Sequence, residues 1–401
     1  MYERLFVDNV IDRFYIKYRT RYEPYRLMDV LHTHIKTVFT NQNVPREYIK
    51  DRVVKLWNYQ DQLKNLIELP KLEQRSPEWY NARQNLITAS DFAQALGKGK
   101  FGTQKQFFQK KCGYEPDNFD SSAPALRWGV MYESVAIDAY AAKNGTQMYE
   151  FGLLIHPEKH MKWFGASPDS ITELGIMVEI KCPWRRKITG EIPEQYYYQM
   201  QGQLDVCGLT ECDYLECEFV EYDNKEDFVR HFADNPNEKG IIIEYLHDNT
   251  TKYVYSPFAA CHNVHGLVGW LEKEYETVAA KHSVTKVHFW QLHTYSVVRV
   301  YKNDEFLNAN FPLLKQVWDK IMSYKADRAL YDSQVCCVMP SKKQEPRLTL
   351  NLDDFTATAS ASAPVPLRAP APSPASALTG SPLPTDKDKW AGYSFLPSDE
   401  D

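Results

Sequence analysis

Residues 166–183 read Ala-Ser-Pro-Asp-Ser-Ile-Thr-Glu-Leu-Gly-Ile-Met-Val-Glu-Ile-Lys-Cys-Pro. Apolar residues on both sides of a short turn at 172–175 predict two neighbouring strands, at about 163–172 and 176–182. Charged side chains interrupt both apolar segments. The sequence therefore predicts a hairpin that carries chemistry.

The charged residues of this stretch form a candidate metal site. Residues two apart in a strand share a face, so Glu179 and Lys181 point the same way while Ile180 points into the core. Asp169 lies at the end of the preceding strand, where two converging strands can hold it and Glu179 on one cation. Burying charge without a partner or a metal is costly, which favours a functional role for these residues.

The donor set predicts phosphodiester chemistry with Mg²⁺, and Mn²⁺ is a second candidate ion. Mg²⁺ prefers oxygen ligands, so we expect Asp169, Glu179 and the backbone carbonyl of Ile180 to bind it. Such an ion polarises a phosphate and helps to create hydroxide from bound water. Lys181 can orient that water and screen charge in the transition state. Glu133, from a preceding predicted helix, completes the acidic cluster directly or through water.

The spacing Asp-x₉-Glu-x-Lys also arises by chance in solvated hairpins, but further motifs accompany it here in a fixed order. Together they resemble the lambda-exonuclease-like, YqaJ-type viral recombinase family of the PD-(D/E)XK nuclease superfamily. The resemblance is close from about Gln74 to Asp213, and residues 69–79 are similar to versions from large DNA viruses. The motifs are Trp79-x₃-Arg83-x₃-Ile87-Thr88-Ala89-Ser90, Trp-Gly-x-x-Tyr-Glu at 128–133, Ser-Pro-Asp at 167–169, Glu-Ile-Lys-Cys-Pro at 179–183 and Gln-Met-Gln at 199–201.

The resemblance implies a fold and an activity. The fold is an α/β (α+β) PD-(D/E)XK restriction-endonuclease-like core, with a central mixed sheet flanked by helices. The activity is a Mg²⁺-dependent 5′→3′ exodeoxyribonuclease that digests double-stranded DNA ends and leaves 3′ single-stranded tails for viral recombination or genome processing. Relatives form a toroidal trimer around DNA, so the resemblance also implies a homotrimer.

The resemblance also assigns roles to individual residues. Asp169 and Glu179 would be the metal ligands, Lys181 the catalytic lysine and Glu133 the additional acid. The family grips the 5′-phosphate of the DNA end with an arginine, a serine and a glutamine, and these roles fall on Arg83, Ser90 and Gln199. Gln201 is a second candidate in the same helix, and its alternative is a structural hydrogen bond.

Two clusters of basic residues are candidates for contacts with DNA phosphates. Arg185, Arg186 and Lys187 directly follow the catalytic strand. The second cluster consists of Lys98, Lys100, Lys105, Lys110 and Lys111. The alternative interpretation of each cluster is a charged surface that contacts only solvent.

Three other functions remain open at this point. A structure-specific endonuclease or an RNA-degrading host-shutoff nuclease would use the same site. An inactive DNA-binding scaffold would need no catalytic residues, yet all of them are present. The residues for the 5′-phosphate favour the exonuclease, because an endonuclease has no need to hold an end.

Changes in composition and residues that end helices divide the 401 residues into three parts. We expect a helical N-terminal extension at 1–70, a nuclease domain at 71–335 and a disordered Pro/Ala/Ser-rich linker with an acidic aromatic tail at 340–401. The tail is a candidate docking motif for a single-strand-annealing or single-strand-binding protein. The net charge of −6 does not by itself indicate nucleic-acid binding.

The remaining elements follow from periodicity and caps. Residues 123–143 and 194–207 are predicted helices, and 213–221 is a predicted strand. Further predictions are a helix start at 88–91, strands at 241–243 and 297–300, and a helix from 303 to about 325.

Eight cysteines occur, and none forms a Cys-x-x-Cys pair. We predict free buried thiols in a reducing compartment. The N-terminus has no apolar signal core, and no apolar run of 18 residues occurs. We therefore expect an intracellular protein without a membrane partner, at a cytoplasmic or nuclear site of viral replication.

Overall fold

The computed structural model describes residues 4–40, 44–70, 72, 74, 76–100, 102–114 and 123–336. The linker and acidic tail predicted at 340–401 lie outside the described residues, and so does the docking motif expected there.

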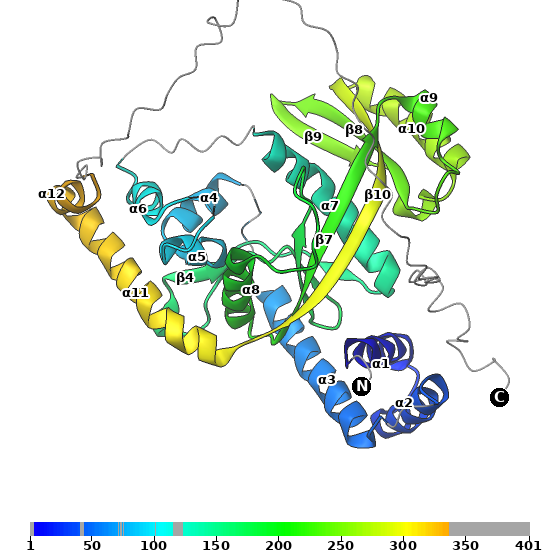
Figure 1. Ribbon diagram of the computed structural model, residues 1–401, viewed down its shortest axis with the longest axis horizontal. Helices are drawn as coiled ribbons and strands as arrows, with labels where there is room; N and C mark the ends of the chain where they lie inside the picture. The colour runs from blue at the N-terminus through cyan, green and yellow to red at the C-terminus, as the bar shows by residue number, and fades with distance from the viewer. Residues whose placement is uncertain are drawn as a thin grey trace, which may run out of the picture. The chain divides into compact units, whose positions relative to one another are not determined.

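A seven-stranded mixed sheet forms the centre of the fold (Figure 1), as predicted. Its strand order is β2-β5-β6-β7-β10-β8-β9, and only the neighbours β6 and β7 run parallel. The strands are β2 (Met148–Tyr149), β5 (Ser170–Thr172), β6 (Met177–Lys181), β7 (Glu211–Tyr222), β8 (Lys239–His247), β9 (Thr250–Tyr255) and β10 (Ser283–Tyr301). A separate three-stranded sheet has the order β1-β4-β3, with β1 (Ile87–Thr88), β3 (Leu154–Ile155) and β4 (Phe164–Ala166).

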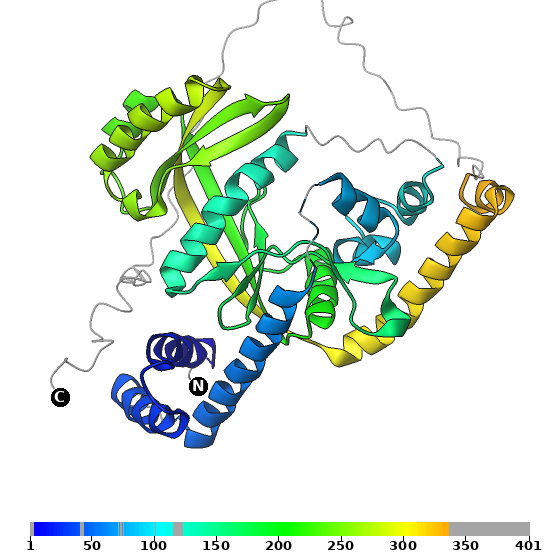
Figure 2. The same ribbon diagram turned by 180° about the vertical axis from the view of Figure 1, so that it is seen from behind.

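Two helices cover opposite faces of the sheet at β6. Val178 and Ile180 pack in one apolar cluster with residues of α7 (Pro124–Asn144), such as Tyr132. Glu179 points to the other face, where Gln203 of α8 (Glu194–Cys207) contacts it. Figure 2 shows α7 in front of the sheet, and Figure 1 shows it behind. Strand alternation therefore separates an apolar face from a face that carries the site.

Helices surround the sheet on both sides. The long helix α11 (Asp304–Ala326) runs past α5 (Phe92–Ala95) and α6 (Gln104–Cys112), as Figure 1 shows. At the other end, α10 (Val264–Ala279) packs on β8 and β10. The other helices are α1 (Arg4–Tyr18), α2 (Pro24–Val38), α3 (Arg46–Glu68), α4 (Pro77–Gln84), α9 (Lys225–Arg230) and α12 (Arg328–Tyr331).

The N-terminal helices dock on the sheet through buried ion pairs. Arg52 of α3 donates to Asp12 of α1 (2.6 and 2.8 Å) and to Glu211 of β7 (2.7 and 2.8 Å). Arg299 of β10 also donates to Glu211, at 2.7 Å. Removing one partner of such a cluster leaves an uncompensated buried charge, so these contacts hold α1 and α3 to the core.

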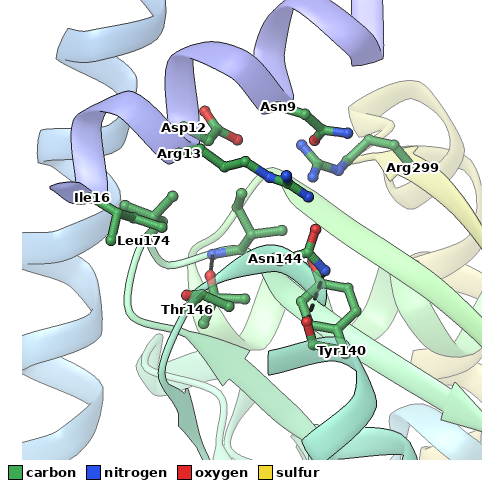
Figure 3. Close-up of a pocket in the computed structure, with 11 residues that line it drawn as sticks. Asn9, Asp12, Arg13, Ile16, Tyr140, Asn144, Thr146, Leu174 and Arg299 are labelled. Atoms are coloured by element: carbon green, nitrogen blue, oxygen red, sulfur yellow. Dashed lines mark hydrogen bonds between the residues drawn. The ribbon is translucent and has the colours of Figure 1, made fainter. Parts of the chain in front are cut away.

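A small polar cavity lies beside this ion cluster (Figure 3). Asn9, Asp12 and Arg13 of α1 face Tyr140 and Asn144 of α7 across it. Its volume of about 30 Å³ is enough for water and too small for a larger ligand. The interface of α1 with the core is therefore polar as well as apolar.

One predicted strand is divided in the structure. The strand predicted at 163–172 was wrong, because the segment forms two strands, β4 and β5, in different sheets. Residues 167–169 join them, and Pro168 has no backbone N–H for a ladder. By contrast, the helix predicted at 194–207 is confirmed as α8, and the helix at 123–143 as α7.

The predicted free thiols are confirmed for the six cysteines whose side chains the structure describes. All six are buried, and β7 alone holds Cys212 and Cys217. None of the helices in the described part of the chain combines the length and apolar character that crossing a membrane requires.

Candidate functional site

The segment between β4 and β5 places Asp169 beside β6. Its Oδ2 accepts a hydrogen bond from the backbone N–H of Ile180 at 2.8 Å. In an extended strand the N–H and C=O of one residue point to the same side. The carbonyl of Ile180 therefore points toward the Asp169 side of β6, where the sequence predicted a third oxygen ligand.

Glu179 is fully buried and engaged through both carboxylate oxygens. Lys181 forms an ion pair with Oε1, and Gln203 Nε2 donates to Oε2 at 2.8 Å. Lys181 Nζ also lies 4.9 Å from the ring centroid of Tyr196. Glu179 and Lys181 therefore share a strand face, as predicted, and Gln203 of α8 orients the Glu179 carboxylate.

The electrostatics of the pair favour a bound cation. Burial raises the pKa of Asp169 well above its usual range, and the neighbouring charges of Glu179 and Glu133 raise it further, against the opposing effect of Lys181. Burial lowers the pKa of Lys181, but Glu179 and Asp169 outweigh it and the net shift is upward. Two carboxylates crowded at one buried position are the condition that a divalent ion relieves.

Glu133 reaches the site from the opposite layer. It lies on α7, and its charge acts on Asp169 and on Cys182. Among the described residues, no group of three or more His, Cys, Asp or Glu side chains is arranged to hold a metal ion. The structure brings Asp169 and Glu179 together, and it places Glu133 within electrostatic reach of Asp169.

The oxygen donors fit a hard divalent ion. Two carboxylates and one carbonyl leave room for the waters that Mg²⁺ keeps. The side-chain oxygen of Gln203, Oε1, is buried and has no hydrogen-bond partner in the described part of the chain. A buried acceptor of this kind needs a donor, such as a metal-bound water.

The residues predicted to hold a 5′-phosphate converge next to this site. Arg83 Nη2 donates to Ser90 Oγ at 2.9 Å. Ser90 and Gln199 line one cavity of about 150 Å³, together with Lys100 and Tyr196. Because Tyr196 also contacts Lys181, the cavity and the carboxylate pair are neighbours.

Trp79 contacts both the proposed phosphate pocket, through Arg83, and the loop that carries Asp169, through Ser167. The guanidinium of Arg83 stacks on the Trp79 ring, 4.2 Å from its centroid. The indole N–H of Trp79 donates to Ser167 Oγ at 3.3 Å. Gln203 Nε2 contacts the carbonyl of the same serine at 3.4 Å. Ser167 lies two residues before Asp169, so both halves share one loop.

A buried ion pair fixes the chain around Ser90. Asp91 Oδ2 accepts from the N–H and hydroxyl of Thr88 and lies 2.8 Å from Lys111 Nζ. Burial raises the pKa of Asp91, but Lys111, Lys110 and Arg83 outweigh it, so that pKa lies well below its usual range. Lys111 is 2% exposed and also donates to the carbonyls of Arg83 and Leu86. The expected phosphate contact of Lys111 was therefore wrong, because its ammonium is committed inside the protein.

Gln201 has a different environment from the other glutamines of α8. Its Nε2 donates to the carbonyl of Tyr301 at 2.9 Å, and its Oε1 accepts from the N–H of Asn303 at 2.7 Å. It is fully buried. Both ends of the amide join α8 to the end of β10, so Gln201 makes structural hydrogen bonds.

The basic cluster after β6 divides into two kinds of side chain. Arg186 forms an ion pair with the buried Glu216 at 2.5 Å. Arg185 stacks on the exposed Trp184, with 4.0 Å from its guanidinium carbon to the ring centroid. Arg185 and Lys187 are exposed. These two remain candidates for contacts with DNA, and Arg186 has a structural partner.

Gln203 is a functional candidate that sequence reasoning did not select. It was visible as the third glutamine of the Gln-x-Gln-x-Gln run at 199–203. Residues four apart on a helix share a face, so its spacing from Gln199 was the available signal.

The chain matches a known domain over residues 78–212. The matching family is described as the YqaJ-like viral recombinase domain. The segment holds the five motifs on which the resemblance was based, and the family resemblance is confirmed. The match supports a nuclease role and a divalent metal as the cofactor of the site.

Proteins of large DNA viruses are similar to this chain. A protein of Acanthamoeba polyphaga mimivirus is 27% identical over 303 residues, which cover 64% of this chain and 54% of that protein. A protein of African swine fever virus is 19% identical over 356 residues, which cover 71% of this chain and 95% of that protein. The chain thus spans about half the length of the mimivirus relative.

Two solved structures match about half of the chain. One is an alkaline exonuclease from Laribacter hongkongensis, with 24% identity and a TM-score of 0.32, covering 51% of this chain and 97% of that one. The other is a phage-related exonuclease from Haemophilus somnus, with 14% identity and a TM-score of 0.27, covering 50% of this chain and 98% of that one.

Proposed function

We propose that this chain, which contains a YqaJ-like viral recombinase domain at residues 78–212, is a metal-dependent exonuclease that digests duplex DNA from 5′-phosphorylated ends. Its product would be a 3′ single-stranded tail for viral recombination or genome processing. The observation that carries the proposal is the cavity lined by Ser90 and Gln199. It adjoins the Asp169 and Glu179 pair through Tyr196.

The chemistry follows from the donor set. Asp169, Glu179 and the carbonyl of Ile180 would hold Mg²⁺ or Mn²⁺, which supplies charge stabilisation at the scissile phosphate and acidifies bound water. Gln203 holds Glu179 in place, and Glu133 adds negative charge near Asp169. Lys181 places a fixed positive charge where negative charge develops. Its ion pair with Glu179 favours the protonated ammonium, which can donate hydrogen bonds to the phosphate or to the attacking water.

The phosphate pocket favours an exonuclease over an endonuclease. Arg83 and Ser90 already contact each other and would grip a terminal phosphate by charge-assisted hydrogen bonds. A phosphate held there would place the neighbouring phosphodiester toward Lys181. An enzyme that cuts inside a strand has no terminal phosphate to hold.

Further proposals concern the assembly. The DNA strand would pass Arg185 and Lys187, the exposed basic residues that follow β6. We also propose a homotrimer around DNA, a viral replication site in the cytoplasm or nucleus, and a single-strand-annealing or single-strand-binding partner at the C-terminal segment.

The test compares four substrates: linear duplex DNA with 5′-phosphate, linear duplex DNA with 5′-hydroxyl, closed circular DNA, and RNA. With Mg²⁺, the 5′-phosphorylated duplex should be digested fastest and circles should stay intact. Arg83→Ala and Gln199→Ala should remove the preference for 5′-phosphate, lowering cleavage of that substrate by about 10- to 100-fold because each loses a charge-assisted hydrogen bond. Lys181→Ala should abolish cleavage of both linear substrates.

The outcomes separate the alternatives. Cleavage of circles at a rate equal to that of linear DNA would identify an endonuclease. Preferred cleavage of RNA would identify an RNA-degrading nuclease. Absence of metal-dependent cleavage of every substrate would leave the DNA-binding scaffold.

A further inference from the structure

The N-terminal helices hold a cavity that the nuclease site does not use. It has a volume of about 560 Å³ and is formed by the end of α1, the turn that follows and the middle of α3. Tyr22 and Trp57 give it aromatic walls, and both are half-buried. Arg19 and Lys64 also line it, in ion pairs with Glu173 and Asp61. Aromatic planes beside cations are the combination that binds unpaired nucleotides.

The segment around this cavity is basic in a chain that is acidic overall. Residues 17–26 read Lys-Tyr-Arg-Thr-Arg-Tyr-Glu-Pro-Tyr-Arg, with four basic side chains and one acidic one. Residues 4–68 contain 12 basic and 8 acidic residues, a net charge of +4, whereas the whole chain has −6. Charge is therefore concentrated where it can attract an anionic chain.

Arg21 and Arg26 do not line the cavity but lie beside the ring of Tyr22, which does, and they are called its rim. The guanidinium carbons of Arg21 and Arg26 lie 5.8 and 5.5 Å from the ring centroid of Tyr22. Both side chains are exposed, and neither has an ion-pair partner among the residues that the structure describes. Both guanidinium groups therefore lie beside the Tyr22 ring, and their positive charge is available to bind phosphates.

Arg19 carries an unsatisfied donor at the cavity wall. Its Nη2 pairs with Glu173 Oε2 at 2.6 Å. Its Nη1 is buried and has no hydrogen-bond partner in the described part of the chain. A buried guanidinium N–H without an acceptor is rare in folded proteins, so the present contacts of Arg19 leave one of its donors unused.

We propose that this cavity binds single-stranded DNA, with a base stacked against Trp57 or Tyr22 and its phosphates on Arg19, Arg21 and Arg26. The cavity admits an unpaired base, whereas a duplex presents only stacked edges. Gln60 in its lining can hydrogen-bond a base edge. Asp61, also in the lining, is paired with Lys64, which leaves the arginines as the contacts for phosphates.

The inference rests on the proposed function only for the source of the ligand, which would be the 3′ tail left by digestion. Binding itself can be measured without cleavage. We would measure fluorescence anisotropy of a labelled 20-nucleotide oligothymidylate with the full chain carrying Lys181→Ala, without metal. The double variant Arg21→Ala/Arg26→Ala is compared with the control Lys36→Ala/Lys50→Ala, which removes two exposed lysines of α2 and α3.

The rim variant should bind about tenfold more weakly, and its salt slope should fall by about 1.4 because each neutralised phosphate contributes about 0.7. The control should change neither quantity. Oligonucleotides carrying 5-iododeoxyuridine should cross-link on irradiation to peptides containing Tyr22 or Trp57. Equal affinity and slope for the rim variant and the parent would overturn the inference.

Three further results would also overturn it: cross-links confined to residues of the nuclease site, stronger binding of RNA of the same length, or equal competition by polyglutamate. Failure of the proposed function looks different. If the chain binds oligothymidylate through Arg21 and Arg26 but digests no DNA, the proposed DNA-binding cavity is supported and the proposed exonuclease activity is contradicted.

Discussion

At the scale of the residue, the site depends on how completely Glu179 is held. Lys181 occupies one carboxylate oxygen and Gln203 the other, and the carboxylate is fully buried. Three glutamines follow one another on α8, and helix geometry gives them different tasks. Gln199 and Gln203 are four residues apart and share a face, whereas Gln201 points away and bonds the backbone at the end of β10.

The first prediction concerns Gln203→Ala. Without the amide, Glu179 loses its fixed orientation, so the metal concentration for half-maximal cleavage should rise about 10- to 100-fold, as is usual when a residue that orients a ligand is removed. A metal titration of the cleavage rate measures this. Gln201→Ala is the matched control, because it should lower the melting temperature and leave the metal requirement unchanged. An unaltered metal requirement in Gln203→Ala would assign Gln203 to packing alone.

At the scale of the element, the hairpin of β5 and β6 links the site to the N-terminal helices. Gly175 in its turn has φ of +75°, and a Cβ there would lie 2.6 to 2.9 Å from atoms of Tyr59 on α3. The turn thus needs glycine for two reasons, its left-handed backbone and the close approach of α3.

The second prediction separates those reasons. Gly175→Ala should destabilise the protein by about 1 kcal/mol more than Gly145→Ala, because both glycines have positive φ but Gly145 has open space around its Cβ position. Urea unfolding of the two variants gives the comparison. Equal losses would mean that α3 moves aside without cost.

Prediction from sequence succeeded where one local signal decided the element, and failed where a distant partner did. The alternation of β6 and the face of α8 that buries Met200 and Leu204 were both readable from residue spacing. The division between β4 and β5 was not readable, because it depends on their pairing in two different sheets. The full length of β10 was also missed, since its partners β7 and β8 come from elsewhere in the chain.

The same distinction applies to the site. Asp169, Glu179 and Lys181 lie within 13 residues, and their meeting could be predicted from two adjacent strands. The link from Trp79 to Ser167 crosses 88 positions of sequence, and no periodicity reports it. Lys111 is an error of the opposite kind, because this lysine of a basic run is buried with Asp91 and two backbone carbonyls as its partners.

At the scale of the whole molecule, the N-terminal helices are bound to the nuclease core by buried charge. Burial raises the pKa of Glu211, but Arg52 and Arg299 outweigh it and lower that pKa from 4.5 to about 2. Asp12 differs, because burial raises its pKa despite the neighbouring Arg52. A substitution of Glu211 alone therefore tests the carboxylate whose pKa is lowered in the folded protein, without changing Asp12.

The third prediction is a pH-dependent loss of stability in Glu211→Gln. The folded pKa lies below the unfolded one, so the stabilisation is present above about pH 4.5 and is lost as pH falls toward 2. The variant should unfold with about 3 to 5 kcal/mol less free energy at pH 7, because Arg52 and Arg299 both lose a buried carboxylate, although Arg52 keeps Asp12. Urea unfolding from pH 7 down to pH 3.5 should show the gap narrowing below pH 4.5. A gap that stays constant would contradict the ionic origin.

The parallel pairing of β6 with β7 also limits how this protein can evolve. The register opposes Glu179 to Tyr214 and Lys181 to Glu216. Gain or loss of a single residue in the turn before β6 would slide the strand by one position and exchange its two faces. Glu179 would then enter the apolar layer under α7, and Ile180 would take its place at the site. A one-residue insertion or deletion in that turn should therefore disrupt the site.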